Sequence, residues 1–213
     1  MKLKVACLAA MSLLRLIPAV CRAQEFSADI VYFATGDPNP PASRAQTSAH
    51  PPSKLFVSKD KMRLETRGLT GTILLVNKGE RTAYALFPAQ KEYQPLSGGP
   101  SEYFRVQDAE NACPDWQKAA DQKIICEKVG PEVVEGRQTV KYQNKGAADT
   151  ATWAVWIDLA LKYVVKWEGD KTGAELRNIQ EGVQAAELFA VPAGYQALKP
   201  RKSSTKGFPQ RKP

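Results

Sequence analysis

The chain has 213 residues, of which 43% are hydrophobic and 24% charged, and it carries 30 Lys and Arg residues against 22 Asp and Glu. This composition is typical of one ordinary globular domain and excludes disordered and collagen-like chains. No apolar run approaches the roughly 18 residues that a membrane-spanning helix needs, and the single histidine, His50, argues against zinc sites with paired histidines and against Ser-His-Asp hydrolase sites.

The net charge of +8 belongs to the two ends of the chain. Residues 1–23 carry four positive charges and residues 199–213 carry six, with no acidic residue in either segment. The chain between them therefore has a net charge of −2. Nucleic-acid-binding modules concentrate positive charge on the folded surface, so we expect no nucleic-acid partner.

The N-terminus has the order of a secretory signal peptide. Lys2 and Lys4 precede an apolar stretch over 5–14, and Cys21-Arg22-Ala23 offers small residues for cleavage before Gln24. We therefore expect export to the periplasm or beyond, with residues 1–23 removed. Two alternatives stay open: lipidation of Cys21, for which the preceding residues form a poor lipobox, and an uncleaved N-terminal helix.

Export changes the interpretation of the cysteines. Cys7 and Cys21 would leave with the signal peptide, and Cys113 and Cys126 would remain as an even pair in an oxidising compartment. We predict a structural disulfide between them, which would stabilise the fold by roughly 3 kcal/mol in the chain-entropy model. A redox role is disfavoured because the two residues are far from Cys-x-x-Cys spacing.

Short strands with alternating apolar residues fill the first half of the body. We expect strands over 25–33, 54–57, 61–65, 72–76, 81–87 and 91–96, separated by turn signals and therefore paired antiparallel. A Pro-rich stretch over 36–52 interrupts them, and we interpret it as a surface loop that contains His50. His50 in that loop is expected to be exposed, and no metal site is predicted.

A second meander fills the C-terminal half. A helix over 114–123 is expected to be tethered by the disulfide to the strand that starts after Cys126. Further strands are expected over 133–143, with a bend at Glu135-Gly136, and over 150–158, 162–168 and 174–180, followed by a short helix over 185–190. This gives nine or ten strands and two short helices in one domain over 24–198, with a disordered basic tail over 199–213.

Several short motifs resemble a known family. They are Phe26-Ser27-Ala28-Asp29, Lys61 to Glu65, Pro88 with Tyr93, Cys126 to Gly136-Arg137, Trp156-Ile157-Asp158, Leu188-Phe189, and Pro192 to Gly194-Tyr195. Together they cover residues from about 25 to 198 and resemble an exported bacterial family of uncharacterised function. That family is similar in turn to the LolA/LolB-type lipoprotein carriers and their outer-membrane lipoprotein-sorting relatives.

The resemblance implies a mainly β fold, namely one strongly curved antiparallel sheet that forms an unclosed barrel, with short helices covering an apolar cavity on its concave face. In the carriers this cavity accepts acyl chains, whose burial is worth about 0.8 kcal/mol per CH₂ and needs no reactive group. The implied function is a non-enzymatic, monomeric carrier of lipid or acylated lipoprotein cargo without cofactors. The basic tail is a departure from the carriers. Its charges would add a peripheral contact with anionic membrane, and a solvated tail without function is the open alternative.

Candidate lining residues for such a cavity follow from strand alternation. They are Leu55, Val57, Met62, Leu64, Ile73, Leu75, Tyr84, Leu86, Trp153, Val155, Tyr163, Val165 and Trp167. Taken singly, each is also explained as ordinary core. A bulge would place Trp156 inside instead of Trp153. Lys59 is nearest in position to the basic residue that the carriers use in cargo transfer, although its place in a turn explains it without function.

Two other functions stay open. An envelope sensor or interaction module of the same fold would fill the cavity with its own side chains and bind a protein partner. A hydrolase is suggested by Ser58-Lys59-Asp60-Lys61 and Lys171-Thr172-Gly173, which match S-x-x-K and K-T-G, but the first lies in an expected turn instead of at a helix start. The carboxylates that could pair for acid/base chemistry are Asp29, Glu65, Asp158 and Glu175.

Overall fold

The computed structural model describes residues 24–35, 52–67, 71–96, 104–119, 125–144 and 153–198. The strands are β1 (Phe26–Ala34), β2 (Ser53–Val57), β3 (Lys61–Glu65), β4 (Ile73–Asn77), β5 (Thr82–Phe87), β6 (Glu92–Pro95), β7 (Cys126–Val134), β8 (Arg137–Asn144), β9 (Trp153–Asp158), β10 (Tyr163–Glu168), β11 (Thr172–Glu181) and β12 (Gln196–Ala197). One α-helix, α1 (Cys113–Ala119), and one 3₁₀ helix, η2 (Ala186–Phe189), complete the described elements.

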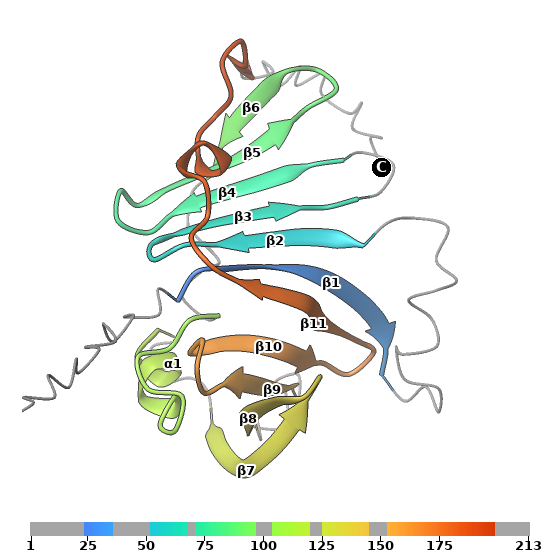
Figure 1. Ribbon diagram of the computed structural model, residues 1–213, viewed down its shortest axis with the longest axis vertical. Coiled ribbons are helices and arrows are strands. Elements are labelled where there is room, and N and C mark those ends of the chain that lie inside the picture. Colours follow the sequence, from blue (N-terminus) through green and yellow to red (C-terminus); the bar gives the residue numbers. More distant parts are fainter. Residues whose placement is uncertain are drawn as a thin grey trace, which may run out of the picture.

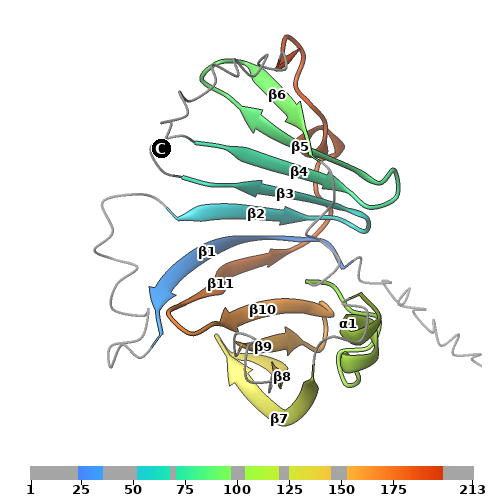
Figure 2. The ribbon, with the colours of Figure 1, turned by 180° about the vertical axis from the view of Figure 1, so that it is seen from behind.

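All twelve described strands belong to a single sheet in the order β12-β6-β5-β4-β3-β2-β1-β11-β10-β9-β8-β7. Neighbouring strands pair antiparallel, except for the parallel pair of β12 and β6. The two ends of the sheet lie far apart, so the curved sheet is not closed into a barrel (Figure 1; Figure 2). The mainly β, unclosed antiparallel architecture expected from the sequence is confirmed.

Most of the expected elements appear within one or two residues of their expected ends. The strand over 61–65 matches β3, and the bend at Glu135-Gly136 is the turn between β7 and β8. The structure also contains β12, which was not expected because two residues are too few to show an alternation of apolar and polar side chains. The expected signal segment 1–23, the Pro-rich stretch up to Pro51 with His50, and the tail 199–213 lie outside the described residues. No helix among the described residues is long and apolar enough to cross a membrane.

The pairing of β1 with β11 joins the two meanders into one sheet. The register runs from Phe26 opposite Glu181 to Ala34 opposite Thr172, with a bulge between Ser27 and Asp29. The chain after β11 then crosses the sheet as a strap, defined here as residues 182–198, which carries η2 and ends in β12 beside β6. The strap lies in front of the strands in Figure 1 and behind them in Figure 2.

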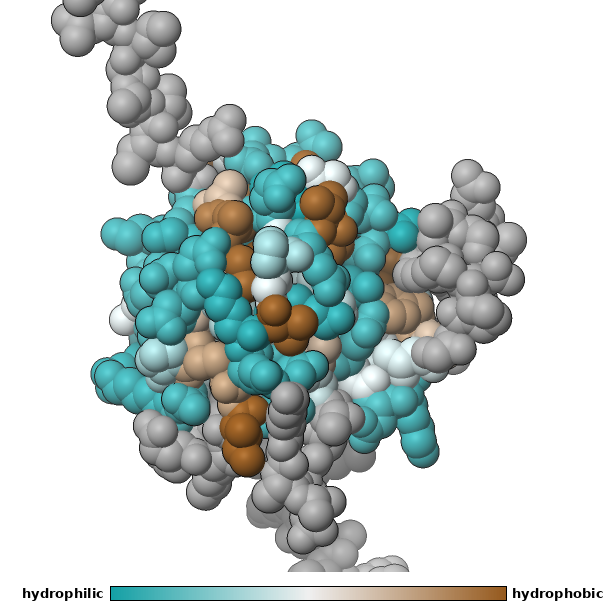
Figure 3. All heavy atoms as spheres, turned by 90° about the horizontal axis from the view of Figure 1, so that it is seen from below, coloured by the Kyte–Doolittle hydropathy of each residue, from teal (hydrophilic) through white to brown (hydrophobic). Residues whose placement is uncertain are grey.

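At the β7 end of the sheet, exposed hydrophobic side chains are scattered and do not form a continuous patch. Ile125, Val129 and Val133 are exposed on or beside this edge strand. The view from below shows such residues separated by hydrophilic neighbours (Figure 3). A bulge between Lys128 and Gly130 and the proline Pro131 interrupt the regular edge, and both features discourage pairing with another strand.

Gly173 provides a test of the junction between β1 and β11. A Cβ atom at this position would lie 2.5 Å from Cζ of Phe33 and 2.7 Å from the carbonyl oxygen of Trp167. Because both the ring and the backbone would have to move, we expect Gly173→Ala to lower the free energy of unfolding by about 1–3 kcal/mol in urea titration. Gly169→Ala is the control, since the nearest atom to its added Cβ is 3.5 Å away. Equal stability of the two variants would contradict this account.

Candidate binding surface

One face of the sheet carries two complete rows of apolar side chains across β1 to β5. Residues directly opposite each other on paired strands share a face, and the registers connect Phe26, Val57, Met62, Val76 and Ala83 into a first row. The same registers connect Ala28, Leu55, Leu64, Leu74 and Ala85 into a second row. We call this side of the sheet the apolar face.

The two rows differ in exposure. In the first row Val57 is 2% exposed and Met62 is 6% exposed. In the second row Leu64, Leu74 and Ala85 are only half-buried. Half-buried leucines at neighbouring positions on paired strands form an apolar surface that further burial would stabilise, at about 25 cal/mol per Å².

The apolar face continues onto the second meander, where the protein's own chain covers it. Paired residues carry the face from Tyr32 through Ala174, Trp167 and Val155 to Tyr142. Over this part lies the plug segment, defined as residues 104–119, which ends in α1. Trp116 packs edge-on against Tyr142 and Trp153, with ring centroids 5.5 and 5.7 Å apart. Phe104 packs against Trp167 and stacks on Tyr163, with centroids 5.8 and 6.1 Å apart.

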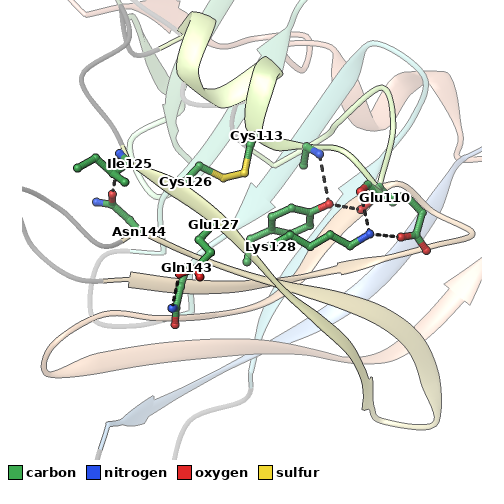
Figure 4. Close-up of a disulfide and its surroundings, with 11 residues drawn as sticks. Glu110, Cys113, Ile125, Cys126, Glu127, Lys128, Gln143 and Asn144 are labelled. Carbon is green, nitrogen blue, oxygen red and sulfur yellow. Dashed lines mark hydrogen bonds and ion pairs between the residues drawn. A yellow bond between two sulfur atoms is a disulfide. The ribbon is translucent and has the colours of Figure 1, made fainter.

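Polar contacts and a disulfide fix the plug segment. The hydroxyl of Tyr142 donates to the carbonyl of Ala109 at 2.9 Å and accepts from the amide of Ala112 at 3.3 Å. The predicted disulfide between Cys113 and Cys126 is confirmed, and it ties the start of α1 to the start of β7 (Figure 4). Lys128 of β7 forms an ion pair with Glu110. The second meander therefore has a filled apolar face.

The structure divides the thirteen predicted lining residues between two locations. Nine contribute to the apolar clusters around Phe26 and Tyr142: Leu55, Val57, Met62, Leu64, Trp153, Val155, Tyr163, Val165 and Trp167. Ile73, Leu75, Tyr84 and Leu86 instead lie on the opposite face, because the register pairs Met62 with Val76 and Leu75 with Arg63. In β4 every residue from Ile73 to Val76 is apolar, so alternation alone cannot choose between the faces.

The opposite face is partly covered by the strap. Arg63 donates from Nη1 to the carbonyl of Leu188 at 2.9 Å, which holds η2 over β3 and β4. A cavity of about 240 Å³ lies beneath it, and Leu75, Tyr84, Phe189 and Val191 line part of this cavity. Leu75 and Tyr84 therefore face the strap.

Trp156 also lies on the opposite face, so Trp153 and not Trp156 faces the plug segment. The Nζ atoms of Lys141 and Lys166 lie 4.6 and 4.4 Å from the centre of the Trp156 ring system. The indole N–H donates to Glu132, and this hydrogen bond is the main cause of the lowered pKa of the Glu132 carboxyl. Two lysine cations therefore lie close to the ring system of Trp156, which is 2% exposed.

The four carboxylates considered for acid/base chemistry each have their own cationic partner. Asp29 pairs with Lys54, Glu65 with Arg63, Asp158 with Arg137, and Glu175 with Arg177. Burial alone would raise the pKa of Asp29, but hydrogen bonds from Asn178 and Lys54 lower it. Burial raises the pKa of Glu175, and Arg177 opposes that shift. Pairing with cations in the sheet explains these residues as stabilising contacts.

The S-x-x-K match spans the turn between β2 and β3, where no helix begins, and the K-T-G match enters β11 from a turn. Both contexts differ from what hydrolases of that class require. Among the described residues, no group of three or more His, Cys, Asp or Glu side chains could hold a metal ion.

Arg105 is a structural residue that no local sequence pattern singles out. Its guanidinium lies 5.8 Å from the ring centre of Tyr163 and donates to the Gln24 side-chain oxygen at 2.8 Å and to the Gln24 carbonyl at 2.7 Å. It also donates to the carbonyl of Ser58 at 3.3 Å. Burial lowers the pKa of Arg105. Its contacts link three chain segments at one end of the apolar face.

Solved structures of other proteins have a similar fold. No family model matches the sequence, and no curated protein matches it. An uncharacterised conserved protein from Thermus thermophilus has a similar structure, with a TM-score of 0.50 and 8% identity, over 83% of this chain and 90% of that one.

Two further solved structures are similar at lower scores. A putative outer-membrane lipoprotein-sorting protein domain from Vibrio parahaemolyticus matches with a TM-score of 0.34 and 14% identity, over 77% of this chain and 88% of that one. A chain in the structure of the MucA/MucB complex from Pseudomonas aeruginosa matches with a TM-score of 0.39 and 18% identity, over 80% of this chain and 56% of the matched chain. This chain therefore spans about half the length of the matched chain. Lipoprotein-sorting structures are thus among the matches, and the likeness concerns the fold alone.

Removal of the disulfide tests its role in holding the plug segment. We expect Cys113→Ser/Cys126→Ser to lower the free energy of unfolding by about 3 kcal/mol, because the bridge spans 13 positions of sequence. Urea unfolding of residues 24–213, followed by circular dichroism, measures this change. Reductant should destabilise the parent protein and leave the double variant unchanged. A parent protein that is as stable reduced as oxidised would refute the prediction.

Proposed function

We propose that the chain is an exported, non-enzymatic envelope protein that binds the acyl chains of a lipid or an acylated lipoprotein on the apolar face between β1 and β5. The observation that supports this proposal is the pair of apolar rows, of which the second stays half-buried at Leu64, Leu74 and Ala85. Each CH₂ group that leaves water on such a surface is worth about 0.8 kcal/mol, so a chain of a dozen carbons offers ample binding energy.

The remaining parts of the proposal come from the ends of the chain. The first 23 residues would direct export and be removed before Gln24. The tail 199–213, with six positive charges and no acid, would keep the monomer near anionic membrane at roughly 1 kcal/mol per charge close to the surface.

One observation favours a second function. The plug segment fills the apolar face of the second meander through Phe104 and Trp116. A sensor or interaction module would have such a filled interior and would bind a protein partner elsewhere. This alternative predicts no lipid binding on β1 to β5.

The second apolar row provides the test. We expect residues 24–213 to bind palmitoyl-lysophosphatidylcholine below its micelle concentration, and Leu64→Asn/Leu74→Asn to bind it at least tenfold more weakly. Loss of contact with two CH₂ groups already costs about 1.6 kcal/mol, and every 1.4 kcal/mol is tenfold in affinity. Native mass spectrometry and isothermal titration measure the binding.

The control replaces half-buried apolar residues on the other face of the same sheet. Val31 lies opposite Glu175, and Phe56 lies opposite Arg63, so Val31→Asn/Phe56→Asn changes polarity without touching the apolar rows. This variant should bind like the parent protein. The proposal fails if the parent binds no lysolipid, or if both double variants lose affinity equally while circular dichroism shows them folded.

A further inference from the structure

A basic depression at one end of the apolar face is lined by residues of the β2–β3 and β4–β5 turns and by Arg105. The two turns lie at the same end of the sheet (Figure 1). Its lining combines Val57, Met62, Val76 and Tyr163, which we call its floor, with Ser58, Lys59, Asp60, Lys61, Lys78 and Arg105. We define the basic rim as Lys59, Lys78 and Arg105. Lys61 also contributes to the lining, but it alternates with Met62 along β3 and also lines the cavity beneath the strap on the opposite face. The three cations of the rim accompany a single carboxylate among the lining residues, that of Asp60.

Arg105 is held in the rim by neutral groups. Its described hydrogen bonds go to the side-chain and main-chain oxygens of Gln24 and to the carbonyl of Ser58. Burial lowers the pKa of Arg105, and electrostatic interactions with Tyr163, Asp60 and Glu25 oppose this shift without cancelling it. An anion placed in the rim would add charge compensation for this partly desolvated cation.

The floor of the depression continues into the proposed acyl-binding surface. Val57, Met62 and Val76 belong to the first apolar row, and their strand neighbours Leu55, Leu64 and Leu74 belong to the second. Two residues along a strand correspond to about 7 Å. The depression itself encloses about 30 Å³, the volume of about one water molecule. It therefore admits an oxygen atom of a headgroup, and an attached chain would extend along the rows.

We propose that the ligand is an anionic amphiphile, whose phosphate or carboxylate headgroup binds at the basic rim while its acyl chain lies across the second apolar row. This inference rests on the proposed function and names the substrate class of the same surface. It assigns a role to Lys59, Lys78 and Arg105, and it fixes the direction of the bound chain from the turns toward Leu64 and Leu74.

The test compares two lysolipids that share one chain. Palmitoyl-lysophosphatidylglycerol carries a net negative charge, and palmitoyl-lysophosphatidylcholine carries none. We expect the parent protein, residues 24–213, to bind the anionic lipid at least fivefold more tightly, since one cation near an anionic headgroup is worth about 1 kcal/mol. This preference should decrease as sodium chloride is raised, because salt screens surface charge.

Substitution of two exposed lysines tests whether the basic rim causes the preference for the anionic lipid. Lys59→Gln/Lys78→Gln should remove the preference for the anionic lipid and leave the affinity for palmitoyl-lysophosphatidylcholine unchanged. Lys118→Gln/Lys171→Gln removes the same charge from exposed positions elsewhere and should keep the preference. Arg105 is left intact because its contacts join three segments and its loss would endanger folding.

The possible results separate the two proposals. Equal affinity of the parent protein for both lipids overturns the headgroup assignment and leaves the acyl-binding surface in place. A preference that persists in Lys59→Gln/Lys78→Gln overturns the assignment to this rim. Inorganic phosphate that binds as tightly as the anionic lipid would show that the rim recognises a free anion and not an amphiphile. Failure of both lipids to bind overturns both proposals.

Discussion

The pairing of β1 with β11 is the interaction on which the rest of the structure depends. The first meander, β2 to β6, and the second, β7 to β10, are each built from hairpins of local sequence, and β1 and β11 join them from opposite ends of the body. Additional contacts reinforce the junction: Asn178 donates to Asp29 at 2.7 Å, and the amide of Gly182 donates to the carbonyl of Glu25 at 2.9 Å. Because these segments are far apart in the sequence, pairing β1 with β11 costs much conformational entropy of the chain.

The junction also determines how the apolar face is divided between stability and binding. On the second meander, the plug segment covers this face and the disulfide holds the segment in place. On the first meander, the second apolar row stays half-buried. On β1 to β5 the first apolar row is buried and the second is half-buried, so substitutions at Leu64 and Leu74 can test binding without removing the most buried side chains.

Much of the fold was predictable because most strands pair with their neighbours in the sequence and show a clear alternation of apolar and polar residues. The β3 strand, the β7–β8 turn and the Cys113–Cys126 pairing all follow from residue pattern and compartment. The face assignment of Ile73, Leu75, Tyr84 and Leu86 was wrong because β4 is apolar on both sides, and only the register with β3 decides which side each residue occupies. In β5 it is Ala83 and Ala85, and not Tyr84 and Leu86, that lie on the apolar face.

The residues that the sequence could not reveal are those defined by distant contacts. Arg105 lies 81 positions from Gln24 and 47 from Ser58. No local sequence pattern distinguishes it from other arginines. The basic rim combines two turns with this arginine, so its cations are dispersed in sequence and become a cluster only when β2 to β5 are in register. The same registers place Val57, Met62 and Val76 beneath the rim. The cations and the apolar rows thus meet at one end of the sheet as a direct consequence of strand pairing.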